Sequence, residues 1–227
     1  MRRAFVLATL FLLLQTRQAL AADQAIDVSA GTQGIAGAFV QGVGPGTDVR
    51  LAFSDFEFTR TQNFSNLVID VIANLAVHET FQLRSFGVYT DRVVSGPFHV
   101  TGGLIYNLNR IAGTSVPTDS SVVIAGVPYS QQNAGEIFTI VRWPAIAPYL
   151  GVGFSPRLTA RRRIAFFGDA GVYYQGNARV EFSASGAIAA NYAQFQPYFD
   201  EGRRQLAAEL SPVIVYPVVQ IGVRFGL

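Results

Sequence analysis

The chain contains no cysteine and no lysine, and it carries little charge of either sign. Without cysteine in its 227 residues, no disulfide can staple the fold, which excludes the small disulfide-rich scaffolds. All 17 basic residues are arginine. Charged residues make up 14% of the sequence and hydrophobic residues 50%, whereas a soluble domain has about 25% charged residues. This composition indicates a surface that largely does not face water.

Long apolar runs are also missing beyond the N-terminus, which disfavours a helical membrane protein, since a membrane helix needs about 20 such residues. The N-terminus predicts a secretory signal peptide over residues 1–22, with Arg2 and Arg3, an apolar core at 4–14 and a small-residue cleavage site at 19–21. An uncleaved anchor helix is the alternative, but the apolar core is too short to span.

We expect residues 23–227 to form one exported domain. Removing Arg2, Arg3 and Arg17 leaves 14 arginines against 15 acidic residues, a net charge of −1. A nearly neutral chain gives no indication of nucleic acid as a partner.

The mature chain alternates apolar residues with small or polar ones, which is the period of a β-strand. Phe98 and Val100 lie on one face of the clearest example, and His99 and Thr101 lie on the other. The pattern predicts strands at 24–30, 33–43, 48–60, 80–93, 97–111, 137–154, 162–183 and 213–226. Short connections alternate with long ones at 61–79, 113–135 and 185–211, as in outer-membrane barrels.

These features predict an all-β fold, an eight-stranded antiparallel transmembrane β-barrel. In hydrocarbon every backbone N–H and C=O must be paired internally, which a closed barrel achieves. The 22 glycines are frequent on the mixed face and suit a narrow lumen. A secreted β-sandwich is the competing interpretation, but its solvent face should carry more charge.

One stretch breaks the β pattern and predicts a single short helix within 197–210, in the last long connection. Pro197 suits its first turn. An extended loop is the alternative. Because the opposite face is charged, we expect the helix to be a lid over the barrel mouth. Its apolar face would consist of Phe195, Phe199, Leu206 and Leu210.

The ending "VRFGL" resembles the last strand of Gram-negative outer-membrane proteins, although Leu227 replaces the usual terminal Phe and Phe225 lies two positions earlier. In that group such a segment is the signal read by the barrel-assembly machinery, so the resemblance implies this role for Val223, Phe225 and Leu227. "APYLGVGF", "FFGDAGVYYQG" and "YPVVQIGVRF" resemble a family of small, largely uncharacterised outer-membrane barrels, OmpA- or OmpW-like in plan. This resemblance covers the second half of the chain and implies a fold and an outer-membrane location, with no catalytic residues to carry over.

Residues with catalytic or ligand-binding chemistry are few. His78 and His99 have no nucleophile motif beside them, so we interpret His78 as a solvated loop residue and His99 as a hydrogen-bonded lumen residue. No metal-ligand spacing occurs, and we predict no catalytic, cofactor-binding or metal-binding residue. Asp169 and Arg224 both lie on mixed faces, which predicts a structural charge pair inside the lumen.

The function predicted first is therefore a non-enzymatic outer-membrane barrel with a structural role or an interaction role carried by its long loops. A narrow channel or carrier for a small solute is the alternative, and a lipid-modifying enzyme is favoured less. The expected partners are outer-membrane lipid, the assembly machinery during insertion and an unidentified small solute. The arginines at 161–163 would lie at the inner rim, either solvated or near phosphate headgroups.

Overall fold

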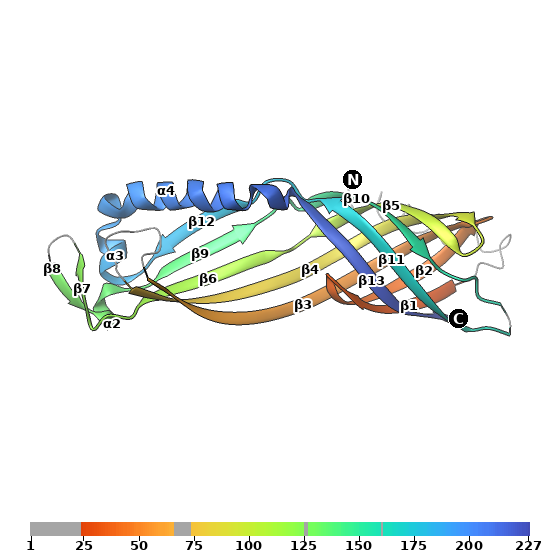
Figure 1. Ribbon diagram of the computed structural model, residues 1–227, viewed down its shortest axis with the longest axis horizontal. Coiled ribbons are helices and arrows are strands. Elements are labelled where there is room, and N and C mark those ends of the chain that lie inside the picture. The colour runs from red at the N-terminus through yellow and green to blue at the C-terminus, as the bar shows by residue number, and fades with distance from the viewer. Residues whose placement is uncertain (1–23, 66–73, 125–126, 160) are drawn as a thin grey trace, which may run out of the picture.

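The computed structural model describes residues 24–65, 74–124, 127–159 and 161–227, so the expected signal peptide lies outside the described residues. Most of these residues form one twisted antiparallel sheet, drawn out along the long axis of the molecule (Figure 1). The 11 strands of this sheet are β1 (Gln24–Gly31), β2 (Gly34–Gly44), β3 (Thr47–Ser65), β4 (Asn74–Ser95), β5 (Phe98–Asn107), β6 (Arg110–Pro117), β9 (Ile137–Arg142), β10 (Ile146–Phe154), β11 (Ile164–Tyr174), β12 (Arg179–Ala184) and β13 (Val215–Gly226).

Eight of these strands close into a ring, in the order β4-β3-β2-β1-β13-β11-β10-β5 and back to β4. The closing pair is β4 with β5, from Ser85 opposite Asn107 down to Ser95 opposite Phe98. The ring strands correspond to the eight predicted ones. The predicted strands 97–111, 137–154 and 162–183 were wrong in one respect, because each is broken into two.

The three breaks lie at the same level of the molecule. Between β5 and β6, the side chain of Asn109 accepts a hydrogen bond from the backbone N–H of Arg84 at 3.0 Å. Between β9 and β10, Pro144 lacks the N–H that a ladder needs. Between β11 and β12, Gly176 has a φ of +71°, and a Cβ there would lie 3.1 Å from Pro144 Cγ. The sheet continues past these breaks, but the ring ends at this level because β1, β2 and β13 do not extend beyond it.

Beyond the breaks the sheet forms an open, curved extension of the strands β3, β4, β6, β9 and β12 (Figure 1). β2 pairs with β3 only as far as Asp55, so the part of β3 beyond Asp55 belongs to the extension. β3 and β4 reach well into the predicted connection at 61–79.

A small hairpin and two short helices lie at the far end of the extension, and a longer helix runs back along it toward the ring (Figure 1). The hairpin consists of β7 (Ser121–Ile124) and β8 (Val127–Ser130). The helices are α2 (Gln131–Ala134), α3 (Gly186–Ala190) and the 18-residue α4 (Tyr192–Glu209), followed by the 3-10 turn η1 (Ser211–Ile214). None of the helices in the described ranges is both long and apolar enough to cross a membrane.

The predicted helix exists, but it begins at Tyr192, so Pro197 lies in its interior rather than in its first turn. The proline cannot bond the carbonyl of Ala193, and both residues are exposed, so water can satisfy that carbonyl. α4 lies along β12, with the rings of Phe199 and Phe182 stacked at 5.9 Å. It covers the side of the extension rather than the end of the ring (Figure 1).

The apolar face of the sheet changes sides between ring and extension. Every ring strand points its exposed apolar side chains outward. Its buried side chains, both apolar and polar, point inward. On the extension the outward residues form polar cross-strand pairs, such as Asp55 with Arg84 at 2.9 Å and Glu57 with Gln82 at 2.8 Å. The concave face of the extension is apolar instead. The outward apolar residues of the ring include Ile26, Phe39, Leu51, Val88, Leu104, Leu150, Phe166 and Ile221, one from each strand.

Candidate functional site

A layer of buried charges crosses the interior of the ring. Arg50 on β3 donates to Asp169 on β11 at 2.6 Å and to Asp91 on β4 at 3.2 Å, and all three side chains are at most 5% exposed. The guanidinium also lies over the ring of Tyr89, 5.2 Å from its centroid. Each charge is paired, as burial requires.

Asp169 is the centre of this layer. It accepts a further hydrogen bond from Gln220 at 2.9 Å, and its other oxygen lies 2.9 Å from His99 Nε2. The interpretation of His99 as a hydrogen-bonded lumen residue is confirmed. His78 is exposed, as predicted, but it lies on β4 and pairs with Thr61 at 2.9 Å, so it is not a loop residue.

The structure does not bring Asp169 and Arg224 together. Their strands β11 and β13 are neighbours, but the residue opposite Asp169 is Gln220. Arg224 lies four positions further along, roughly 13 Å at the usual rise of a strand. It lies opposite Asp27 on β1 instead and binds that carboxylate through two contacts of 2.8 Å. The predicted pair is therefore wrong, although both charges are buried and paired inside the ring.

Tyrosine rings fill the interior next to the charge layer. Tyr89 and Tyr149 pack edge to face at 5.1 Å, and Tyr173 is fully buried. A Cβ on Gly87 would lie 2.3 Å from the ring of Tyr89, and one on Gly151 would lie 2.4 Å from the hydroxyl of Tyr149. The inner glycines therefore make room for aromatic rings. They do not leave an open pore.

The described pockets inside the ring and at its short-turn end are small. A pocket bordered by Arg50, Tyr89 and Phe167 measures about 20 Å³, enough for roughly one water molecule. A second pocket of about 140 Å³ lies at the end with the short turns, beside His99 and Arg224.

The largest of the described pockets lies outside the ring, between α4 and the concave face of the extension, and measures about 420 Å³. We call it the α4 cavity. Its size falls in the range of about 300–1,000 Å³ that holds a drug-sized ligand. The sheet contributes the apolar side chains of Val77, Phe81, Ile111, Ile137, Val141 and Phe182.

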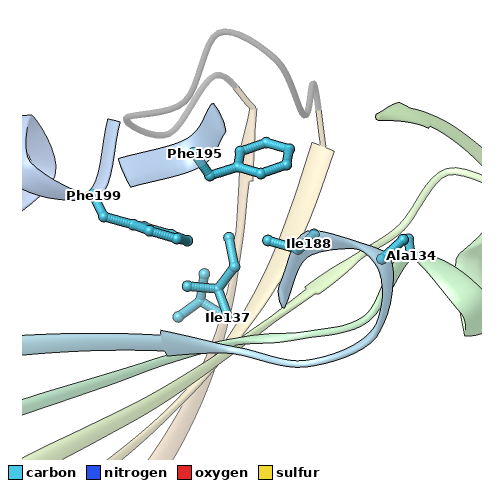
Figure 2. Packing of buried hydrophobic residues seen from close by; sticks show 7 residues of the cluster. Ala134, Ile137, Ile188, Phe195 and Phe199 are labelled. Carbon is cyan, nitrogen blue, oxygen red and sulfur yellow. The ribbon is translucent and has the colours of Figure 1, made fainter. Parts of the chain in front are cut away.

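The two halves of α4 make different contacts. Phe195 and Phe199 are 1% and 2% exposed and pack with Ile137, Ile188 and Ala134 (Figure 2). These contacts anchor the first half of the helix.

In the second half, Leu206 and Leu210 are only partly buried and line the α4 cavity. All four residues of the predicted apolar face thus turn toward the protein. Between them lies Gly202, which is buried, lines the cavity and was missed as a site residue. A glycine between Phe199 and Leu206 on an apolar face is the signal that could have revealed it.

One ion pair lines the α4 cavity. Arg60 on β3 donates to Glu79 on β4, and its guanidinium lies 4.9 Å from the centroid of the Phe81 ring. Glu209 of α4 also lines the cavity.

The proposed assembly residues lie on the outside of the ring. Phe225 and Leu227 are 40% and 64% exposed, and Phe225 lies opposite Ile26 on β1 and Ile164 on β11. Val223 occupies the same face. Recognition of this segment by the assembly machinery stays a prediction. Within the described ranges, no group of three or more His, Asp or Glu side chains is placed to hold a metal ion.

Comparison with known proteins supports the fold. No protein-family model matches the chain, and no curated protein matches its sequence. Among solved structures, Acinetobacter baumannii CarO2 is 20% identical with a TM-score of 0.55, and the match covers 92% of this chain and all of CarO2. Acinetobacter baumannii CarO is 19% identical with a TM-score of 0.51, covering 90% of this chain and 97% of that one. Both are outer-membrane proteins with β-barrel folds. The chain shares that fold.

Proposed function

We propose that this protein is a non-enzymatic outer-membrane β-barrel that functions by binding through its extension and not by conducting through its ring. The apolar outer belt of the ring supports a place in a bilayer, since outward side chains there contact lipid. The polar outer face of the extension suits water. By the usual arrangement of such barrels, the short turns would face the periplasm and the α4 end would face outward.

One observation carries the proposal. The ring interior is crossed by the Arg50 charge layer and filled by tyrosines, whereas the larger space for a ligand lies outside the ring, in the α4 cavity. A small barrel whose lumen is filled by side chains does not offer a water-filled path.

Conductance in planar bilayers tests this proposal. Purified protein, shown to be folded by its heat-dependent migration in electrophoresis, should leave the membrane current at the baseline of a protein-free bilayer. Discrete conductance steps would instead support the alternative, a narrow channel for small solutes. Mixing the protein with a known open porin in the same bilayer provides the positive control.

A further inference from the structure

We propose that the α4 cavity binds an uncharged amphiphile, a molecule with an alkyl or aryl body and one hydrogen-bonding head group. This inference rests on the proposed function, because it names the ligand class of the same extension. The cavity walls facing the body of such a ligand are apolar from both sides, with Phe81 and Val141 on the sheet and Leu206 on the helix.

Charge argues against an anionic ligand, and a charged head group of either sign would lose hydration on entering a cavity with largely apolar walls. Arg60 is the cation that lines the cavity in the described residues, and Glu79 already pairs with it. Glu209 adds a second carboxylate, so the lining carries one positive and two negative charges. An anionic head group would meet net repulsion, whereas a hydroxyl or amide can share hydrogen bonds with the Arg60–Glu79 pair.

The concave face is open on the β3 side of the cavity. Phe56 and Phe58 lie on the same face of β3 as the buried Arg50 and Ser54, yet they are 44% and 42% exposed. Phe58 stacks on Phe81 of the cavity wall at 4.7 Å. These rings continue the apolar lining outward from the cavity, just beyond the level where the ring ends, so a ligand can enter from the side of β3.

Gly202 allows the cavity to be closed with one substitution. Gly202→Leu would place a side chain into the cavity from α4, and leucine also favours a helix more than glycine does. Ala208→Leu is the matched control, because Ala208 is exposed on the same helix and does not line the cavity.

The test is equilibrium binding of tritiated 1-dodecanol to full-length protein in lipid nanodiscs, counted above nanodiscs without protein. Wild type and Ala208→Leu should show one saturable site per chain. Gly202→Leu should weaken binding by at least about tenfold, since excluding two methylene groups already costs more than that factor. Dodecanoate and dodecylammonium should displace the alcohol less well than unlabelled dodecanol does.

Equal binding by Gly202→Leu, or displacement by dodecanoate or dodecylammonium that equals or exceeds displacement by dodecanol, would overturn the inference. If Gly202→Leu does not fold, Thr139→Leu on the sheet wall fills the same cavity and replaces it. Conductance of the same purified proteins in planar bilayers separates the two proposals. A closed ring without alcohol binding counts against this inference alone, and an open ring counts against the proposed function.

Discussion

At the scale of single residues, the interior of the ring is decided by contacts between strands far apart in the sequence. Arg50 meets Asp169 across 119 positions of the chain, and Asp27 meets Arg224 across 197. Alternation predicts that Asp169 and Arg224 face inward. It does not say which partner each one finds, because that depends on register and on the strands across the lumen.

Removing Arg50 should destabilise the barrel strongly. Arg50→Met leaves Asp91 and Asp169 buried without their shared cation, and losing one partner of a buried ion pair typically costs about 3–5 kcal/mol. In a cycle with Asp169→Asn, the double variant should lose less than the sum of the single losses, by about 0.5–3 kcal/mol. Urea unfolding in lipid vesicles measures these free energies. The Asp169 and Arg224 cycle should show weaker coupling, and equal coupling in both cycles would contradict the observed pairs.

Gly87 should not tolerate a methyl group. Gly87→Ala places a Cβ against the ring of Tyr89, and overpacking of this kind costs about 1–3 kcal/mol. Gly102→Ala is the control, since a Cβ there meets nothing within 4 Å. The temperature at which the folded electrophoretic band disappears should fall for Gly87→Ala and stay within error for Gly102→Ala. A similar fall in both variants would mean that the tyrosines do not occupy this space.

At the scale of elements, α4 and the breaks in three strands distinguish this molecule from a plain barrel. Past these breaks β5, β10 and β11 are followed in the sheet by β6, β9 and β12, whereas β13, β1 and β2 do not continue. In the extension, the helix α4 lies beside β12, at the edge where these three strands are missing. The helix was expected as a lid on the barrel mouth, but it covers the concave face of the extension.

Phe199 should hold α4 in place. Phe199→Ala removes a side chain that is 2% exposed, a loss of about 3–5 kcal/mol for a buried phenylalanine. Amide hydrogen exchange should then speed up across 192–209 and stay unchanged in the ring strands. Arg204→Ala, on the exposed side, should leave exchange unchanged. Protection of α4 that survives Phe199→Ala would show that the aromatic cluster in Figure 2 is not its anchor.

Deleting α4 should not open the ring. With 192–210 replaced by a Gly/Ser linker, the ring should still fold, because its closing strands pair without the helix. The charge layer and tyrosines remain beneath, so conductance should stay at baseline. This expectation reverses the one that follows from a lid over an open mouth. A rise in conductance in a folded, inserted deletion variant would support the interpretation of α4 as a lid over an open mouth.

At the scale of the whole molecule, the outer face of the sheet divides into an apolar ring and a polar extension. Leu150→Arg places a charge on the ring exterior, where it should cost about 2–4 kcal/mol if the residue lies near the bilayer midplane. Thr59→Arg, on the exposed exterior of the extension, should cost little. The fraction of each variant that folds into vesicles, read from heat-dependent migration and β-dominated circular dichroism, checks this. Equal losses would place the membrane boundary elsewhere.

Much of the fold could be predicted from local pattern. Alternation in residues such as Phe98, His99 and Val100 depends only on neighbours in the chain, because successive side chains of a strand point to opposite faces. That periodicity, with low charge and no long apolar run, is enough to predict antiparallel strands, their number in the ring and their inner and outer faces.

Only the tertiary structure decided where the ligand space lies. The apolar residues of β3 change parity between Phe53 and Phe56, but alternation does not say which face is the outside of the ring and which is the inside of the extension, since either side satisfies the same pattern. The two faces are defined by the closure of the ring and by the level at which β1, β2 and β13 stop, which only strand pairing determines. The role of Gly202 also depends on the tertiary structure. In the sequence this glycine only indicates a weak helix, whereas in the folded protein it lines the cavity between α4 and the sheet.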